Sequence, residues 1–231
     1  MVFSNFQKFM LACIIFSIIS CVILLLCFPV GGAIDQSLIR PWMDQFGHFL
    51  YRDNYYLVQW NHKYLKNILI LSYISFLFLW LASFKLERLK PSRWHYGYMF
   101  WVSVLSTGLV GLLKSQSRHA CPWNMTHATP TGFIWDFSAT NGHCFPGGHA
   151  STGFALMTGF FVYRLVSKKY AYVFLFLGMS LGFIMGWGQM MRGAHFLSHN
   201  LWTAWIIWSL NVVLYAVFYK KFQQNTISLS R

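Results

Sequence analysis

Acidic side chains are scarce in this sequence of 231 residues. It holds five Asp and Glu against 18 Lys and Arg, and charged residues make up only 10% of the chain. Soluble domains carry about 25% charged residues, so the composition excludes an ordinary soluble domain. Disordered, collagen-like and disulfide-scaffold classes are also excluded, because 56% of the residues are hydrophobic and the mean hydropathy is +0.45.

No carboxylate side chain follows Asp136. Chemistry in the later part of the chain therefore depends on His, Lys, Arg, Ser or backbone groups. Paired-carboxylate hydrolysis and carboxylate-rich magnesium or calcium sites are poor candidates there. The net charge of +13 does not indicate a nucleic-acid partner, because the basic residues stand in short runs between apolar stretches rather than on one face.

Apolar stretches of membrane-spanning length recur along the chain. A membrane helix needs about 20 mostly apolar residues. The sequence predicts an all-α polytopic membrane protein, a six-transmembrane-helix bundle in which residues 1–231 form one domain. The first stretch is longer than the apolar region of a signal peptide, so we expect it to be retained. The predicted spans are 9–28, 68–84, 96–113, 150–166, 170–187 and 201–219.

Basic residues predict the orientation of this bundle in the bilayer. On one side of the predicted spans lie 11 of the 18 Lys and Arg, and the positive-inside rule makes that side cytoplasmic, together with both termini. The outer side then holds segments 31–67, 114–149 and 188–200, with eight of the nine His. Segment 31–67 is predicted to be partly helical and to lie along the interface, because large apolar residues recur in it at roughly helical spacing.

Two cysteines lie in the central outer segment, and three lie in the first span. Cys121 and Cys144 are 23 positions apart. Paired thiols outside the cytoplasm tend to oxidise, so we predict a disulfide, which contributes roughly 3 kcal/mol by closing the loop. The alternative is two free thiols, or metal ligands together with His119 and His143. The cysteines of the first span serve as small apolar residues.

Three polar groups stand at the outer ends of the predicted spans. They are 114–122, which contains Lys114, Arg118 and His119; 144–151, which contains Gly147, Gly148, His149 and Ser151; and 189–199, which contains Arg192, His195 and His199. Each alone has an ordinary interpretation, such as a snorkelling lysine, a tight turn or a helix cap. Yet glycines before a helix expose backbone N–H groups that can bind an anion. Cations and imidazoles at the same place predict a phosphate-binding site.

The three groups resemble the signature motifs of the type 2 phosphatidic acid phosphatase family, whose membrane members have six spans. The family's first motif is Lys, six residues, then Arg-Pro; here Lys114 is followed by Cys121-Pro122. The second is Pro-Ser-Gly-His, and residues 146–149 read Pro-Gly-Gly-His. The third is Ser-Arg, five residues, His, three residues, Asp. His195 and His199 match its second half with His in place of Asp, and Gln189 stands where the family has Arg.

The resemblance implies roles for individual residues. His195 is the expected nucleophile, which forms a phosphohistidine, and His149 is the general acid and base. His199 orients His195, with Asp136 as an alternative, and a different register of the motif makes His199 the nucleophile. The expected phosphate-binding residues are Lys114, Arg192, Gly147, Gly148 and Ser151, with Arg118 or His119 replacing the charge missing at Cys121. No metal or other cofactor is implied.

The resemblance also implies a function and a location. The expected activity is metal-independent removal of phosphate from a membrane lipid such as phosphatidic acid, phosphatidylglycerophosphate, a polyprenyl diphosphate or lipid A. The expected place is a bacterial inner membrane with a periplasmic active site, with no obligate protein partner. Three alternatives stay open: a phosphotransferase that uses the same intermediate, an inactive family member, and a non-catalytic protein that uses His143, His195 and His199 as a metal or proton site.

Overall fold

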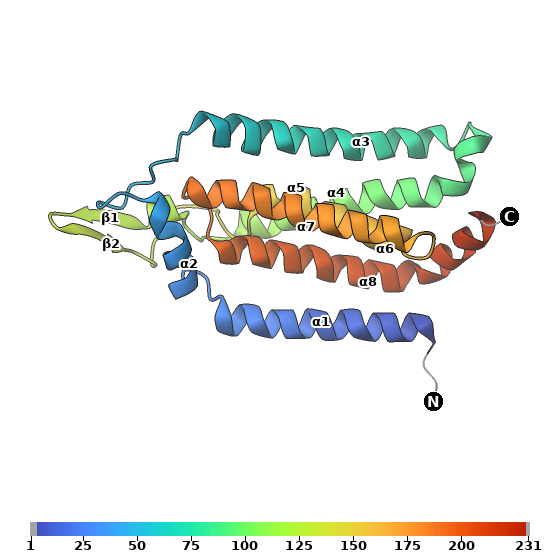
Figure 1. Cartoon of the computed structure of the whole chain (residues 1–231), viewed down its shortest axis with the longest axis horizontal. Helices are drawn as coiled ribbons and strands as arrows, with labels where there is room; N and C mark the ends of the chain where they lie inside the picture. The colour runs from blue at the N-terminus through green and yellow to red at the C-terminus, as the bar shows by residue number, and fades with distance from the viewer. Residues whose placement is uncertain (1–3, 230–231) are drawn as a thin grey trace.

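A computed structural model describes the backbone of residues 4–229 and the side chains of residues 4–224. The chain is mostly helical, and its long helices run side by side (Figure 1). The α-helices are α1 (Asn5–Cys27), α2 (Ala33–Ile39), α3 (Lys66–Ala82), α4 (Arg93–Gln116), α5 (Gly148–Phe154), α6 (Thr158–Tyr163), α7 (Lys168–Met191) and α8 (Leu197–Leu229). Shorter helical segments are η1 (Arg40–Trp42), the π-helix η2 (Tyr56–Leu65), η3 (Glu87–Ser92), η4 (Pro122–Asn124) and η5 (Ala155–Met157).

Five of the six predicted spans correspond to helices long and apolar enough to cross a membrane. These are Asn5–Cys27, Tyr56–Ala82, Glu87–Gln116, Lys168–Met191 and Leu197–Gln224. The sixth predicted span, 150–166, differs: it is helical from Gly148 to Tyr163 but is divided into α5, η5 and α6. The fold is therefore a helical bundle with five candidate membrane spans and one small β-hairpin.

The divided sixth segment lies in the middle of the bundle. Every residue from 150 to 162 is buried. Glycine makes this possible where the segment crosses α7: a methyl group on Gly153 would lie 2.5 Å from the backbone nitrogen of Gly182. Small residues allow such close backbone approach inside membranes. The tyrosine hydroxyl of Tyr73 in α3 also donates to the Thr152 carbonyl at 2.6 Å. The start of this segment, which carries His149, is thus fixed from two sides.

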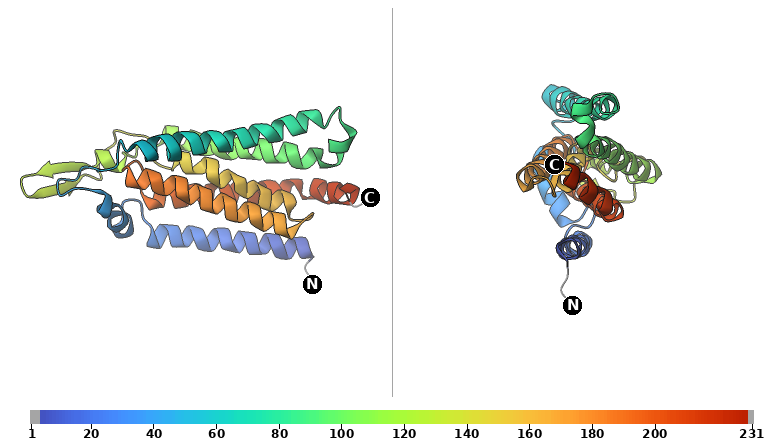
Figure 2. Two further views of the ribbon diagram at one scale, coloured as in Figure 1. Left: turned by 45° about the horizontal axis from the view of Figure 1, so that its top comes forward. Right: turned by 90° about the vertical axis from the view of Figure 1, so that its right-hand side faces the viewer.

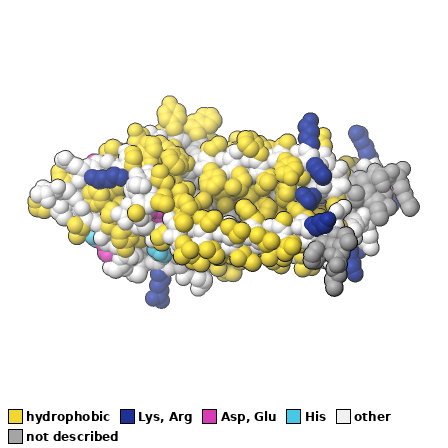
Figure 3. All heavy atoms as spheres, turned by 60° about the horizontal axis from the view of Figure 1, so that its bottom comes forward, with side chains coloured by type: hydrophobic (Ala, Val, Ile, Leu, Met, Phe, Trp, Pro, Cys, Tyr) yellow, Lys and Arg dark blue, Asp and Glu magenta, His cyan; other side chains and the backbone are white. Residues whose placement is uncertain are grey.

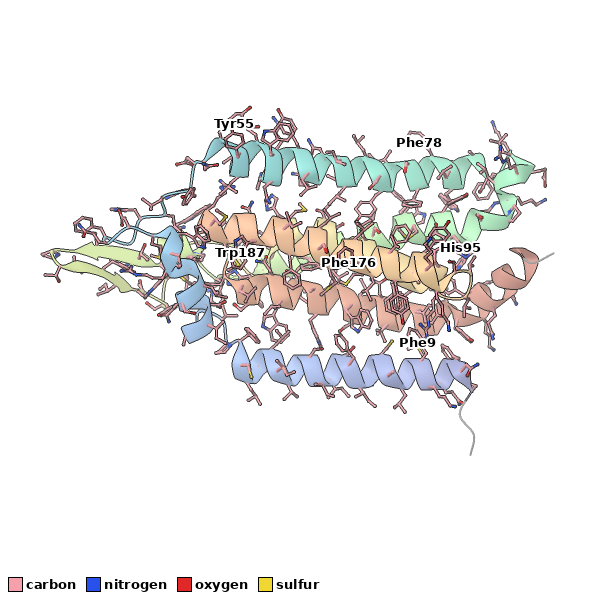
Figure 4. The ribbon with its side chains drawn as sticks, in the orientation of Figure 1. Phe9, Tyr55, Phe78, His95, Phe176 and Trp187 are labelled. Carbon is pink, nitrogen blue, oxygen red and sulfur yellow. A yellow bond between two sulfur atoms is a disulfide. The ribbon has the colours of Figure 1, made fainter. Side chains whose placement is uncertain are left out.

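The outer surface of the bundle is apolar, as a lipid environment requires. Helices α1 and α3 lie at opposite edges (Figures 1 and 2). Phe78 of α3 points away from the bundle and is 65% exposed, whereas Phe9 of α1 points inward (Figure 4). The Arg164 guanidinium lies 3.5 Å from the centre of the Phe9 ring. Figure 3 shows the apolar side of the helices; most of the Lys and Arg visible there lie near the end that holds both termini, and others lie toward the opposite end.

Loops gather at the opposite end of the bundle and form a cap over the helix ends. They contain a hairpin in which β1 (Thr126–Thr129) pairs antiparallel with β2 (Gly132–Trp135), with Thr126 opposite Trp135. The predicted disulfide between Cys121 and Cys144 is confirmed. The cap has its own buried cluster: Ile39, Met43, Phe49, Ala120, Met125 and Phe196. Segment 31–67 is partly helical as predicted, but the chain between η1 and η2 forms turns and a Met43–Phe49 bridge.

Candidate active site

The three polar groups meet at the capped end of the bundle. Lys114 lies in the last turn of α4, His149 in the first turn of α5, and His195 just before α8. The charges of Lys114, His149 and His199 all act on His195. Gly193 makes the sharp connection between α7 and α8, because it adopts φ +78°, which suits glycine after a helix end. The structure therefore brings together the residues that the motifs placed far apart in the sequence.

The two imidazoles of the third motif are buried side by side. His195 is 2% exposed and His199 is 0% exposed. Their Nδ1 atoms lie 3.3 Å apart, and the backbone of Cys144 lies close to both rings and influences the pKa of each. The contact with His199 engages Nδ1 of His195, so Nε2 is the ring nitrogen outside that contact. His199 therefore lies beside Nδ1 of His195 and stands where the family motif has Asp.

Burial is the main influence on the charge of His195. It holds the pKa of the imidazole well below its usual 6.5, and the charges of Lys114, His199 and His149 act in the same direction. The nearby Cys144 backbone opposes this effect and raises the pKa. Burial also lowers the pKa of the nearby His119 imidazole. A neutral His195 has a free lone pair, which is the form a nucleophile needs.

The amide end of α5 lies against a lysine ammonium group. A methyl group on Gly148 would lie 3.2 Å from Lys114 Cδ and 3.8 Å from its Nζ. A helix N-terminus beside a cation attracts anions. The Gly147 amide is different, because it donates to the His199 carbonyl at 3.1 Å. This hydrogen bond joins the second motif to the third and occupies the Gly147 amide that was predicted to bind phosphate.

Several other predicted site residues have partners of their own. The Ser151 hydroxyl donates to the Gly148 carbonyl at 2.6 Å, so it would have to rotate to donate to a phosphate as predicted. Asp136 accepts from the Ser138 amide at 2.9 Å and lies 3.5 Å from His127 Nε2, and neither contact involves His195. His199, which contacts His195 directly, fits the orienting role better.

The two residues predicted to replace the charge missing at Cys121 differ in their burial. Arg118 is exposed, whereas His119 is half-buried with its ring centre 5.9 Å from that of His199. His119 therefore fits the site better than Arg118. His143 is exposed and its Nδ1 contacts the Ser117 carbonyl. A metal or proton site made from His143, His195 and His199 would need His143 to turn away from that carbonyl.

Arg192 lies near the site, and its guanidinium is hydrogen-bonded to two other residues. Its Nε donates to the Arg52 carbonyl at 2.8 Å, and its Nη1 donates to Gln189 Oε1 at 3.2 Å. Gln189 is 2% exposed, and its Nε2 has no hydrogen-bond partner among the described residues. A buried donor without a partner is costly, so an acceptor such as a phosphoryl oxygen would stabilise it. Gln189 thus offers a donor where the family motif has Arg.

Three contributions to the site were not predicted from the sequence. Asp35 of α2 is buried and accepts from the amides of Gly31 and Ser198, both at 2.9 Å, and from the Ser198 hydroxyl. It therefore caps the start of α8. The His62 ring of η2 lies over the His149 ring, with centres 3.7 Å apart, and Lys66 acts electrostatically on the same imidazole. The only sequence signal was that Asp35 and His62 stand on the predicted outer side.

The comparisons with known proteins agree with this geometry. The family model of the PAP2 superfamily matches residues 95–223, which is more than half of the chain. The chain belongs to the PAP2 superfamily. No curated protein and no solved structure matches it. The matched range contains all three motif groups, whereas Asp35, His62 and Lys66 lie outside it. Membership in the PAP2 superfamily implies phosphatase-like activity on phosphate esters.

Proposed function

We propose that this PAP2 superfamily protein is a metal-independent lipid phosphate phosphatase that works through a phosphohistidine on His195. The observation that supports this most is the buried imidazole of His195, which burial and its neighbours keep neutral beside Lys114 and His149. A neutral imidazole is a nucleophile, and fixed cations stabilise the charge that develops on phosphoryl oxygens. Family membership supports phosphatase activity, and these residues support the proposed mechanism.

The reaction proceeds in two balanced steps. In the first, His195 Nε2 bonds to phosphorus, the bond to the lipid oxygen breaks, and His149 gives that oxygen a proton. In the second, His149 takes a proton from water, the water oxygen bonds to phosphorus, and the bond to His195 breaks. Lys114, the Gly148 amide and Gln189 Nε2 hold the phosphoryl oxygens. The negative phosphate favours the protonated His149 that the first step requires.

The surroundings of the site suit a lipid substrate. Leu201, two residues beyond His199, lines an apolar groove of about 450 Å³ between α1, α7 and α8. We place the lipid chains in this groove, with the phosphate at the capped end. The Cys121–Cys144 disulfide favours an oxidising compartment for the cap. Together with the basic residues near the termini, this favours cytoplasmic termini and a site on the opposite face of the membrane. The bacterial inner membrane, with the site in the periplasm, is the location that the family resemblance implies.

The test is phosphate release from a panel of lipid phosphates by the purified protein in detergent and EDTA. The proposal expects release that His195→Ala abolishes. His143→Ala is the matched control, because His143 is an exposed imidazole of the same cap and is expected to leave the rate unchanged. Full activity in His195→Ala, or no release from any substrate, contradicts the proposal. Transfer of phosphate to a second lipid without release would identify a phosphotransferase.

A further inference from the structure

A cavity of about 630 Å³ lies at the end of the bundle that holds both termini, opposite the candidate active site (Figure 1). It lies between the first turns of α1, the connection from α6 to α7, and α8. Three basic side chains line it, those of Lys8, Arg164 and Lys168, together with aromatic rings such as those of Phe6 and Phe9. No carboxylate is among the described residues that line it. The cavity therefore combines positive charge with an apolar wall.

The Arg164 guanidinium is half-buried and held by aromatic rings. Its central carbon lies 3.5 Å from the centre of the Phe9 ring and 5.8 Å from that of the Phe160 ring. Phe9 in turn packs against Tyr215, with the ring planes perpendicular and the centres 5.6 Å apart. A guanidinium over an aromatic ring keeps its N–H donors in its own plane, where they can bind an anion in a forked geometry. The rings thus fix a donor group in the cavity wall.

The positive charge of the cavity is not neutralised within the described residues. No ion pair and no side-chain hydrogen bond found there involves Lys8, Arg164 or Lys168. Glu87, the acidic residue at this end of the bundle, is paired with Lys90 at 3.2 Å, and the four Asp lie at the capped end. Like charges in one cavity repel one another. An anion that accepts hydrogen bonds from all three side chains would remove this repulsion.

The position of the cavity favours a lipid over a soluble anion. Helix α1 has 23 residues, enough to cross a hydrocarbon core of about 30 Å, so its first turns lie at the level of the lipid headgroups. Ala12 lines the cavity, and Phe16 lines the apolar groove between α1, α7 and α8. These two residues are four positions apart and share one face of α1. An anionic head and an apolar chain could therefore bind along the same helix face.

We propose that Lys8, Arg164 and Lys168 bind the headgroup of an anionic phospholipid from the leaflet opposite the candidate active site. The phosphate oxygens accept hydrogen bonds from the Arg164 guanidinium and from the two lysine ammonium groups. The chains lie along α1 and approach the apolar groove from the end opposite to the substrate. The bound lipid holds the first turns of α1 to α7 and α8. The site is not catalytic, and its binding test requires no release of phosphate.

The experiment measures the Kd of dioleoyl phosphatidylglycerol for the purified full chain in detergent by native mass spectrometry. Dioleoyl phosphatidylcholine has the same chains but no net charge, and glycerol 1-phosphate carries the phosphate without chains. We expect the phosphatidylglycerol to bind more tightly than the phosphatidylcholine, and glycerol 1-phosphate at the same concentration not to displace it. A basic residue beside an anionic lipid contributes about fivefold in affinity. The double variant Lys8→Gln/Lys168→Gln should therefore raise the Kd for phosphatidylglycerol roughly twentyfold.

The matched control is Lys169→Gln, because Lys169 is the exposed neighbour of Lys168 and does not line the cavity. Its Kd should equal that of the wild type. Lys8 and Lys168 are exposed, so their double variant should unfold at the wild-type temperature when no lipid is added. Arg164→Gln should also weaken binding, although it removes the contact with Phe9 as well.

Three results would overturn the proposal. The first is an equal Kd for phosphatidylglycerol and phosphatidylcholine, which would mean that charge is not recognised. The second is a Kd for phosphatidylglycerol that is unchanged in Lys8→Gln/Lys168→Gln. The third is displacement of the lipid by glycerol 1-phosphate, which would assign the cavity to a soluble phosphate instead.

Discussion

Replacing Asp35 tests whether α2 holds the catalytic end of α8 in place. The carboxylate accepts hydrogen bonds from the amides of Gly31 and Ser198 and from the Ser198 hydroxyl, all in a buried setting. Losing a helix cap costs about 1 kcal/mol, and a buried donor left without a partner costs about 1–3 kcal/mol more. We therefore expect Asp35→Ala to lower the free energy of unfolding by about 2–4 kcal/mol.

The same change should reduce activity, because His195 and His199 flank the capped residue Ser198. Burial raises the pKa of the Asp35 carboxyl, whereas the hydrogen bonds from Ser198 and Gly31 oppose that rise and favour the carboxylate. Asp35→Asn keeps an acceptor but loses the charge at the helix N-terminus, so its effect should be smaller. The assay is thermal unfolding in detergent together with kcat/KM for a lipid phosphate.

Asp44 provides the matched control for Asp35. It also accepts hydrogen bonds, from the amides of Phe46 and His48, but it does so in an exposed loop of the cap. Asp44→Ala should therefore lower the melting temperature less than Asp35→Ala and leave kcat/KM unchanged. An Asp35→Ala protein that melts and reacts like the wild type would refute the idea that this buried carboxylate positions α8.

The remaining predictions concern His195, the disulfide and helix packing. Because burial lowers the pKa of His195, the neutral imidazole should persist below pH 6.5. A pH profile of kcat/KM in which protonation of His195 reduces activity already at or above pH 6.5 would contradict this. The stability that a neutral His195 provides is complete above pH 6.5 and decreases as the pH falls below it, which unfolding at several pH values measures. Cys144→Ser should lower stability by about 3 kcal/mol and reduce kcat, because the disulfide holds Cys144 next to both imidazoles; unchanged kcat would contradict this. A methyl group on Gly182 would lie 2.3 Å from Phe154 Cδ1, so Gly182→Ala should cost about 1–3 kcal/mol in unfolding experiments.

The sequence predicted the long helices well because each is a continuous apolar stretch. The predicted span 170–187 lies within α7, and the predicted 9–28 nearly coincides with α1. The segment 150–166 was harder, because its apolar pattern does not reveal the 3₁₀ turn at Ala155–Met157. Composition also could not show that this segment would be enclosed by its neighbours rather than exposed to lipid.

The site residues within each motif could be predicted because they stand only a few positions apart in the sequence. Lys114, His149 and His195 converge as expected. The exact use of each backbone group was not predictable, and the Gly147 amide proved to be bonded to the His199 carbonyl. Asp35 and His62 were missed because they reach the site from separate segments. Their contacts depend on how α2 and η2 pack, which no periodicity in the sequence records.

The identity of the phosphorylated residue decides whether His195 is the nucleophile. The protein is mixed with a lipid phosphate labelled in its phosphoryl group, quenched in alkali to preserve phosphohistidine, and digested for mass spectrometry. We expect one acid-labile phosphate on His195, absent in His195→Ala and present in His143→Ala. A phosphate found on His199, or no phosphorylated histidine while phosphate is still released, would contradict it.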